Sequence, residues 1–255
     1  MVRFCPSARA LARTLAGAAG FALALPPAGF AGGCAREAML VFDGSASMAE
    51  LGFDHTAPTR IAEARAALAR AMPRITPVRR VGLLTYGPGG AHSCGGIRLH
   101  FAPRADAAGA VMRAVDRLRP GGLTPLTKSV AAAVEILGDD GIVVLVTDGN
   151  ETCGGTPCAL GTALAAQNPG ITVHVVGFRV VHDPFSWNSP EAGSYDGKTV
   201  AKCLADRTGG TYTSTDTVDA LAAALRQTLG CIMVGMGHLP PGHALPRDRD
   251  RDTTG

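Results

Sequence analysis

The residues with the clearest chemistry are two aspartates and three hydroxyl side chains, drawn from three separate segments: Asp43, Ser45, Ser47, Thr124 and Asp148. Two carboxylates that come close together repel each other unless a cation lies between them. Neutral hydroxyl oxygens combined with few charges are hard donors, which suit magnesium, manganese or calcium better than zinc. We therefore expect a divalent-cation site, with magnesium as the first choice and manganese or calcium as alternatives.

The surrounding sequence predicts elements that would bring these residues together. Asp43 directly follows the apolar run Ala38–Phe42, and Asp148 directly follows Gly141–Thr147, a β-branched run typical of a central strand buried on both faces. Thr124 comes just before the helical pattern Leu126–Leu137. Ligands of an open parallel sheet bind beyond the carboxyl ends of its strands. The three segments should therefore meet at one edge of the sheet.

Apolar runs alternate with helical patterns along the rest of the chain, which predicts an α/β fold. We expect a doubly wound, mostly parallel six-stranded sheet with helices on both faces. Only about ten residues separate the strands 81–86 and 97–101, too few for a helical crossover, so these two should form an antiparallel hairpin at one edge. Pro73 should close the first helix, and Asp106 should lie near the cap of the second. The remaining predicted strands are 171–178 and 211–214, and the predicted helices are 60–72, 106–118, 126–137, 157–167, 199–207 and 218–229.

The pattern of these residues resembles the metal-ion-dependent adhesion site of von Willebrand factor type A and integrin I domains. The resemblance rests on Asp43-x-Ser45-x-Ser47, Thr124 ahead of a proline, and Asp148 followed by glycine. It implies that the two serines coordinate a cation directly and that Thr124 does so in a ligand-bound state, while the aspartates act mainly through water. It also implies an open metal position, which an Asp or Glu carboxylate from a protein partner would complete.

The resemblance covers roughly residues 37–230, including the order of the strands, and it departs from the family at one position. Ala46 occupies a position where many relatives have glycine, which makes the loop slightly stiffer. The implied fold is the Rossmann-like fold of the von Willebrand factor type A domain, here spanning residues 34–231.

Six cysteines follow residue 31, and an even number in an exported chain predicts disulfides. Zinc is the alternative, but Cys153 and Cys158 are separated by a segment with two glycines that does not fit a tight zinc knuckle. The strand order of the resembling family implies that Cys94 bonds Cys153 or Cys158, with the remaining cysteine bonding Cys203. A local bridge between Cys153 and Cys158 is the main competitor. Cys34 and Cys231 would then tie the two ends of the domain.

Both ends of the chain predict segments outside the domain. Residues 1–31 read as a secretory signal, with a basic stretch, the apolar run Leu15–Leu25 and small residues before a cut after Ala31. The apolar run is about a dozen residues, shorter than the roughly 20 of a membrane-spanning helix, so we expect no integral membrane span. The residues before Cys34 lack the large aliphatic side chain of lipoproteins, which argues against anchoring there. Alternating charges in 232–255 predict a flexible tail.

These features together predict an exported, periplasmic or secreted protein-binding module. The formal net charge is only +3, and no run of clustered Lys and Arg marks the folded body, so nucleic acid is not an expected partner. The chain has no nucleophile elbow and no obvious base beside the metal site, so we expect no enzymatic activity. A metal-dependent hydrolase and a structural envelope component are the alternatives. Glu151 and Trp187 should lie on the rim of the metal face, where Trp187 either contacts a partner or packs its own segment onto the domain.

Overall fold

The computed structural model describes residues 35–51, 57–180 and 201–231 of the chain. The predicted signal at 1–31, the predicted tail at 232–255, Cys34 and Trp187 lie outside the described residues. Within the described ranges, no helix combines the length and the apolar character that crossing a membrane requires.

The described residues form a six-stranded sheet in the order β3-β2-β1-β4-β5-β6. Neighbouring strands are parallel except for β2 and β3, which are antiparallel and place β3 at one edge. This arrangement confirms the predicted mostly parallel sheet and its antiparallel edge hairpin. The strands are β1 (Ala38–Asp43), β2 (Val81–Tyr86), β3 (Arg98–Arg104), β4 (Asp140–Thr147), β5 (Gly170–Phe178) and β6 (Tyr212–Thr215).

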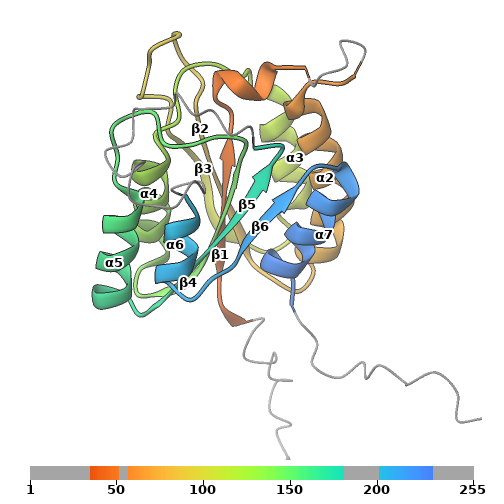
Figure 1. Ribbon diagram of the computed structural model, residues 1–255. Helices are drawn as coiled ribbons and strands as arrows, with labels where there is room; N and C mark the ends of the chain where they lie inside the picture. The colour runs from red at the N-terminus through yellow and green to blue at the C-terminus, as the bar shows by residue number, and fades with distance from the viewer. Residues whose placement is uncertain (1–34, 52–56, 181–200, 232–255) are drawn as a thin grey trace, which may run out of the picture.

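Helices cover both faces of the sheet, as Figure 1 shows. The helices α2, α3 and α7 pack on one face, and α4, α5 and α6 pack on the other. A short 3-10 helix, η1 (Ala46–Ala49), follows β1 and is not evident from the sequence pattern. The helices are α2 (Arg60–Ile75), α3 (Ala108–Arg117), α4 (Leu126–Leu137), α5 (Pro157–Gln167), α6 (Ala201–Arg207) and α7 (Val218–Leu229).

The central strands explain why the sheet is covered on both sides. Every residue of β1 is buried, and its side chains alternate between the two cores. Leu40 packs with the α2 side, while Met39 and Val41 pack with the α4 side. Each such side chain contributes about 1.5–3 kcal/mol when fully buried. A strand with apolar side chains on both faces is stable only between two layers of helices, so these runs determine the architecture.

One predicted helix boundary is wrong. Pro73 lies inside α2, which continues to Ile75. A proline there loses one helical hydrogen bond near the helix end, and burial of Met72 and Ile75 offsets that loss. Asp106 lies near the cap of α3, as predicted: it directly precedes the N-cap residue Ala107, and its φ of 51° places it in the left-handed region.

The first two strands end side by side, which places their following loops against each other. Asp43 and Tyr86 are partners in the β1–β2 register. Gly87 has a φ of +106°, and a Cβ atom there would lie 2.2 Å from the backbone nitrogen of Ser45. The loop carrying Ser45 therefore packs directly on the backbone that follows β2, and only glycine fits at that contact.

We expect Gly87→Ala to lower the free energy of unfolding by roughly 3 kcal/mol, because alanine adds both a clash and an unfavourable φ. Gly90→Ala in the same loop is the matched control, since a Cβ atom there meets nothing within 4 Å. Urea unfolding of the two variants measures the difference. Equal stability of the two variants would show that the contact between the loops is loose.

Candidate metal centre

The carboxylate of Asp43 is completely buried at the end of β1 and accepts three hydrogen bonds. Its Oδ1 accepts from the backbone N–H of Ser45 at 2.7 Å. Its Oδ2 accepts from the Tyr86 hydroxyl at 2.9 Å and from the Thr147 hydroxyl at 2.7 Å. Burial, followed by the charge of Asp43, raises the pKa of Tyr86 well above its ordinary value, so this phenol remains a donor. Asp43 is thus fixed by the ends of all three central strands.

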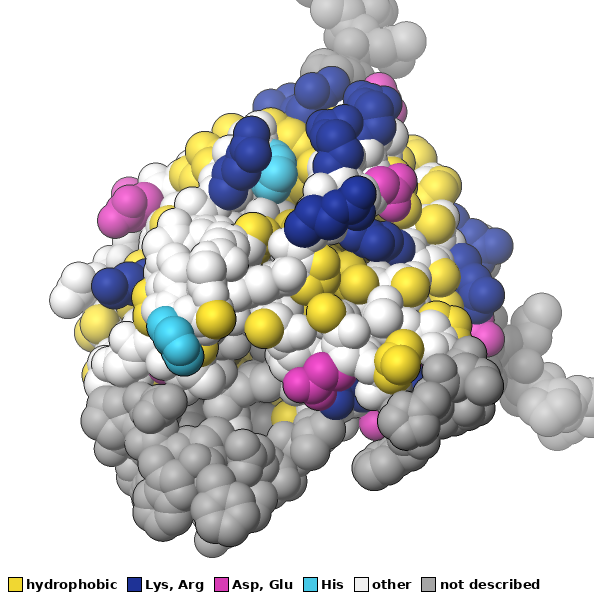
Figure 2. Space-filling model, turned by 90° about the horizontal axis from the view of Figure 1, so that it is seen from above, with side chains coloured by type: hydrophobic (Ala, Val, Ile, Leu, Met, Phe, Trp, Pro, Cys, Tyr) yellow, Lys and Arg dark blue, Asp and Glu magenta, His cyan; other side chains and the backbone are white. Residues whose placement is uncertain are grey.

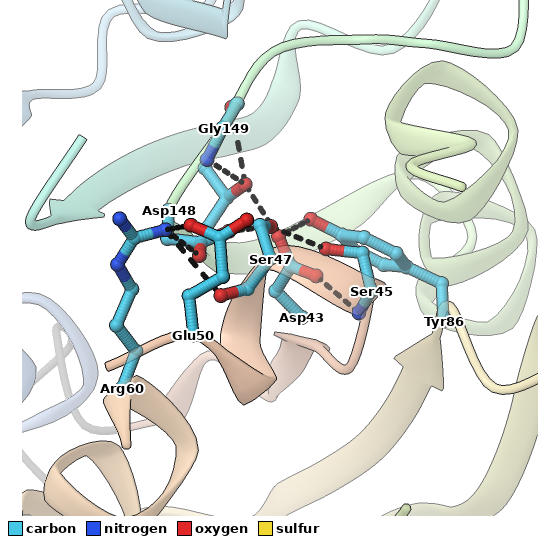
Figure 3. Close-up of polar contacts among 9 residues, drawn as sticks. Asp43, Ser45, Ser47, Glu50, Arg60, Tyr86, Asp148 and Gly149 are labelled. Carbon is cyan, nitrogen blue, oxygen red and sulfur yellow. Dashed lines mark hydrogen bonds and ion pairs between the residues drawn. The ribbon is translucent and has the colours of Figure 1, made fainter. Parts of the chain in front are cut away.

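Two serine hydroxyls connect this region to the second aspartate (Figure 3). The Oγ atoms of Ser45 and Ser47 lie 3.1 Å apart, and Ser47 donates to Asp148 Oδ1 at 2.7 Å. Asp148 is only 2% exposed, and it follows β4 as predicted. The structure therefore brings Asp43, Ser45, Ser47 and Asp148 into one hydrogen-bonded cluster.

The burial of Asp148 makes its negative charge costly. Burial, and next the charge of Asp43, raises the pKa of Asp148 to about 7, although hydrogen bonds from Ser47 and Arg60 oppose the rise. A carboxyl group of this kind is half protonated near neutral pH unless another cation compensates it. A divalent ion at this position would stabilise the charged form.

Arg60, which sequence reasoning did not identify, supplies a positive charge at the site. Its Nη1 lies 2.9 Å from Asp148 Oδ2, 3.3 Å from Glu50 Oε2 and 3.4 Å from the carbonyl of Ser47. The Arg60 side chain is 9% exposed and that of Asp148 is 0% exposed, so this ion pair is buried, while the Glu50 side chain is 62% exposed. Arg60 is the first residue of α2, and Figure 3 shows it reaching from that helix to Asp148.

Thr124 lies in the loop that precedes α4. Hydrogen bonds connect this loop to the loop after Asp148 and to the loop that carries Ser45. Its N–H donates to Thr152 Oγ1 at 2.8 Å, and its carbonyl accepts from the N–H of Thr152 at 3.1 Å. Two residues before it, the carbonyl of Gly122 accepts from the N–H of Ala46 at 3.2 Å. The loops carrying Thr124, Ser45 and Asp148 therefore adjoin one another, as the sequence predicts.

The donor set fits a hard divalent cation. In the described part of the chain, no cluster of three or more His, Cys, Asp or Glu side chains could hold a metal. A cation between Asp43 and Asp148 would consequently depend on serine and threonine oxygens, which magnesium, manganese and calcium accept and zinc favours less. The Ser45–Ser47–Asp148 chain of contacts at 2.7–3.1 Å holds these oxygens together.

Glu151 has a structural role rather than a place on the exposed rim. It is 1% exposed, its Oε2 accepts from the N–H of Thr127 at 2.8 Å, and its Oε1 accepts from the N–H of Cys153 at 2.8 Å. An acidic group at the start of α4 satisfies an otherwise unpaired helix N–H and interacts favourably with the helix dipole. This burial corrects the expectation that Glu151 contacts a partner.

Two disulfides join pairs of described cysteines. Cys94 bonds Cys153, with 5.9 Å between their Cα atoms, and Cys158 bonds Cys203, with 5.0 Å between theirs. This pairing is one of the two arrangements favoured from the resemblance, and the local bridge between Cys153 and Cys158 is not formed. Only the first bond joins two loops, because the second joins the start of α5 to α6.

The proposed tie between the domain ends is described in part. Cys231 is disulfide-bonded, and Cys34, its predicted partner, lies outside the described residues. The pairing of Cys34 with Cys231 therefore stays a prediction.

The residues missed from the sequence are those that stabilise the two carboxylates. Tyr86 and Thr147 end apolar strands and read as core residues, so only the strand register reveals that they face Asp43. Arg60 carries a weak signal: it lies on the stripe of α2 that continues through the buried Ala64 and Ala67, at a helix start where a cation is unfavourable. A basic residue on a buried stripe indicates a buried acidic partner.

Comparisons with known proteins agree with this architecture. Residues 38–151 match the family model described as the von Willebrand factor type A domain. The uncharacterized protein YwmD of Bacillus subtilis is 41% identical over 69 residues, which are 25% of this chain and 31% of that relative. The chain thus spans about a third of the length of this curated relative.

Solved structures show the same fold. The von Willebrand factor type A protein from Catenulispora acidiphila has a TM-score of 0.54 at 19% identity, with 76% of this chain and 42% of that chain covered. Proximal thread matrix protein 1 from the mussel byssus, solved with a zinc-occupied MIDAS motif, has a TM-score of 0.51 at 16% identity, with 77% and 46% covered. At these low sequence identities, the similarity shows a shared fold and nothing about function.

We expect Arg60→Gln to lower the free energy of unfolding of the metal-free protein by about 3 kcal/mol at pH 9, where Asp148, with its pKa of about 7, is ionised and loses its buried cation, and by much less at pH 6, where Asp148 is protonated in both proteins. Added magnesium should recover more stability in this variant than in the parent. Arg70→Gln is the control, since Arg70 lies on the same helix but its pair with Asp219 is exposed. Thermal unfolding with chelator and with magnesium measures both effects, and an equal loss in the two variants would contradict the role of Arg60.

The free energy of unfolding of the metal-free protein should also depend on pH through the titration of Asp148. Its pKa rises from 3.8 to about 7 on folding, so the native state holds a proton that the unfolded chain has lost between these values. The contribution of Asp148 to stability therefore falls as pH rises through this window. Relative to the parent, Asp148→Asn should gain stability as the pH rises from about 4 to about 7, measured by urea unfolding. A parallel pH dependence in both proteins would contradict the shift.

Proposed function

We propose that this chain is an exported member of the von Willebrand factor type A domain family that binds a protein partner through a divalent cation, a proposal supported by the family model matched at residues 38–151 and by the shared fold. The cation would be held by Asp43, Ser45, Ser47, Thr124 and Asp148, with magnesium as the first candidate. When bound, it supplies a Lewis-acid position for an Asp or Glu carboxylate of the partner.

One observation carries this proposal: two almost completely buried aspartates meet at one pair of serines, because Asp43 accepts from the backbone N–H of Ser45 and Asp148 accepts from the hydroxyl of Ser47. Asp43 is 0% exposed, and Asp148 is 2% exposed, yet Ser47, which donates to Asp148, remains partly accessible. Two carboxylates placed together in a low-dielectric region destabilise the fold unless positive charge compensates them. Arg60 provides one positive charge against two negative ones, so the cluster retains an attraction for a further cation.

The hydrogen bonds of the site favour binding over hydrolysis. Both oxygens of Asp43 accept from Ser45, Tyr86 or Thr147, and both oxygens of Asp148 accept from Ser47 or Arg60. These carboxylates are therefore held in place by fixed donors, as the hydrogen-bonded carboxylates around a bound metal ion are. We assign no catalytic residue.

The disulfides support a location outside the cytoplasm. Cys94–Cys153 and Cys158–Cys203 are bonds of the kind that persist in oxidising compartments. Together with the signal predicted at residues 1–31, they favour a periplasmic or secreted protein. Lipid anchoring at Cys34 is not part of the proposal.

Metal binding is tested by isothermal titration calorimetry of the chelator-stripped protein with magnesium, manganese, calcium and zinc. Zinc is included because the MIDAS motif of the mussel protein holds it. We expect saturable binding of one ion, lost in the double variant Ser45→Ala/Ser47→Ala, which removes two neutral oxygen donors. Ser214→Ala is the matched control, because Ser214 is an exposed serine on β6. Unchanged binding in the double variant would remove the basis for the site.

Partner binding is tested by immobilising the protein and exposing it to the envelope fraction of its source cell. We expect capture of a defined protein in magnesium, release by excess chelator, and recovery when magnesium is restored. The Ser45→Ala/Ser47→Ala variant should capture nothing, provided that its circular dichroism matches the parent. Capture that persists in excess chelator would exclude metal-dependent recognition.

A further inference from the structure

A hollow lies beside the metal centre, between the edge of the sheet and the end of α3. It has a volume of about 540 Å³ and is formed by β2, β3, the loop between these strands and the segment 114–119. Three arginines line it: Arg98 from β3, and Arg117 and Arg119 from the end of α3. Figure 2, which looks onto the strand-end face, shows Lys and Arg side chains gathered over one part of it with a His side chain among them. We call this hollow the arginine pocket.

The charge of the arginine pocket is not compensated within the described part of the chain. All three arginines are exposed, and none of them forms an ion pair with a described acidic residue. Residues 88–119 contain five arginines and only two acidic residues, Asp106 and Asp116. Asp116 acts on Arg65, whose guanidinium donates to the carbonyls at the end of α3. The pocket therefore presents three guanidinium groups without a matching anion.

A polar wall lies further inside the pocket. His100 is partly buried, and its Nε2 lies 3.0 Å from the hydroxyl of Thr85, which is 1% exposed. Burial lowers the pKa of His100, and the charges of Arg98 and Arg117 lower it further, which favours the neutral imidazole. Arg98, Arg117 and His100 line the same hollow and can contact one bound group together.

The arginine pocket and the metal centre share a wall. Leu118 lines the pocket, and a Cβ atom added at Gly44 would lie 2.6 Å from Leu118 Cδ2. Gly44 directly follows Asp43, and its carbonyl accepts from the N–H of Gly121 at 3.0 Å. A ligand that occupies the pocket is therefore next to the loop that carries the metal-binding serines.

We propose that the arginine pocket is a separate binding site for an acidic peptide segment, which it holds by pairing carboxylates with Arg98, Arg117 and Arg119. Guanidinium groups bind carboxylates through two parallel hydrogen bonds, and they do so with less desolvation cost than lysine. The proposal does not rest on the metal centre, because the arginines act with or without a cation.

The shape of the pocket favours a peptide over other polyanions. Nucleic acid is held along an extended basic stripe or on stacked aromatic side chains, whereas this pocket is compact and is not lined by Phe, Tyr or Trp. A membrane surface is flat and could not reach the recessed Thr85 and His100. Apolar atoms of Ile97, Leu118 and Pro88 lie beside the arginines and suit the aliphatic part of a glutamate side chain.

The experiment uses the full chain in excess chelator, so that the metal centre contributes nothing. A fluorescently labelled hexaglutamate peptide is titrated with the protein, and hexaglutamine serves as the uncharged control. We expect binding of the acidic peptide only, weakened about tenfold in Arg98→Gln/Arg117→Gln, because each lost charge-assisted hydrogen bond is a substantial part of such an affinity. Arg104→Gln is the matched control: it removes the same charge from the far end of β3, outside the pocket, and should change affinity less than about twofold.

Four results would overturn the proposal. An equal loss in Arg104→Gln would mean that general positive charge attracts the peptide. Binding that needs magnesium and ignores Arg98→Gln/Arg117→Gln would place the peptide at the metal centre. Complete competition by inorganic phosphate at a lower concentration than free glutamate would make phosphate the ligand. Tighter binding of a single-stranded oligonucleotide would make nucleic acid the ligand. Circular dichroism confirms that each variant is folded, so that lost binding has one meaning.

Discussion

The arrangement of the site depends on one constraint: folding brings two carboxylates together and buries them, so their mutual repulsion must be compensated. Asp43 is the last residue of β1, Asp148 directly follows the adjacent strand β4, and both acids are almost completely buried. The neighbouring groups can be understood as compensation for this charge. Tyr86 and Thr147 donate to one carboxylate, and Arg60 and Ser47 donate to the other. This costly arrangement on an otherwise conventional α/β scaffold is the reason that we propose a cation at this place.

The fold could be predicted well because its signals are local and repeated. Strands such as β4 are unbroken apolar runs, and helices such as α4 and α7 have both ends marked by proline, glycine or a change of periodicity. The short connection between β2 and β3 was enough to predict the antiparallel edge. The prediction that failed also concerned a local signal. Pro73 does not end α2, because burial of Met72 and Ile75 outweighs one lost hydrogen bond. Local propensity was overridden there by packing.

The site was predicted less completely, because several of its residues take their roles from tertiary contacts. The serines and aspartates are recognisable by spacing, but nothing in the sequence places Arg60 against Asp148, which is 88 residues away. Glu151 was misjudged for the same reason, since its neighbours suggest an exposed loop and only the approach of α4 buries it. The arginine pocket is a further case. No run of basic residues marks the sequence, yet the hairpin and the end of α3 place arginines from separate segments around one hollow.

The disulfide between Cys94 and Cys153 joins a loop of the arginine pocket to a loop of the proposed metal site. Cys94 adjoins Gly95 in the wall of the arginine pocket, and Cys153 lies in the loop that follows Asp148. Free loops of this kind would have to be ordered by each incoming ligand, at the expense of its affinity. The crosslink removes that cost in advance, so a ligand meets surfaces whose separation is already set. The crosslink therefore does more than stabilise the chain, because it also fixes the spacing between the proposed metal site and the arginine pocket.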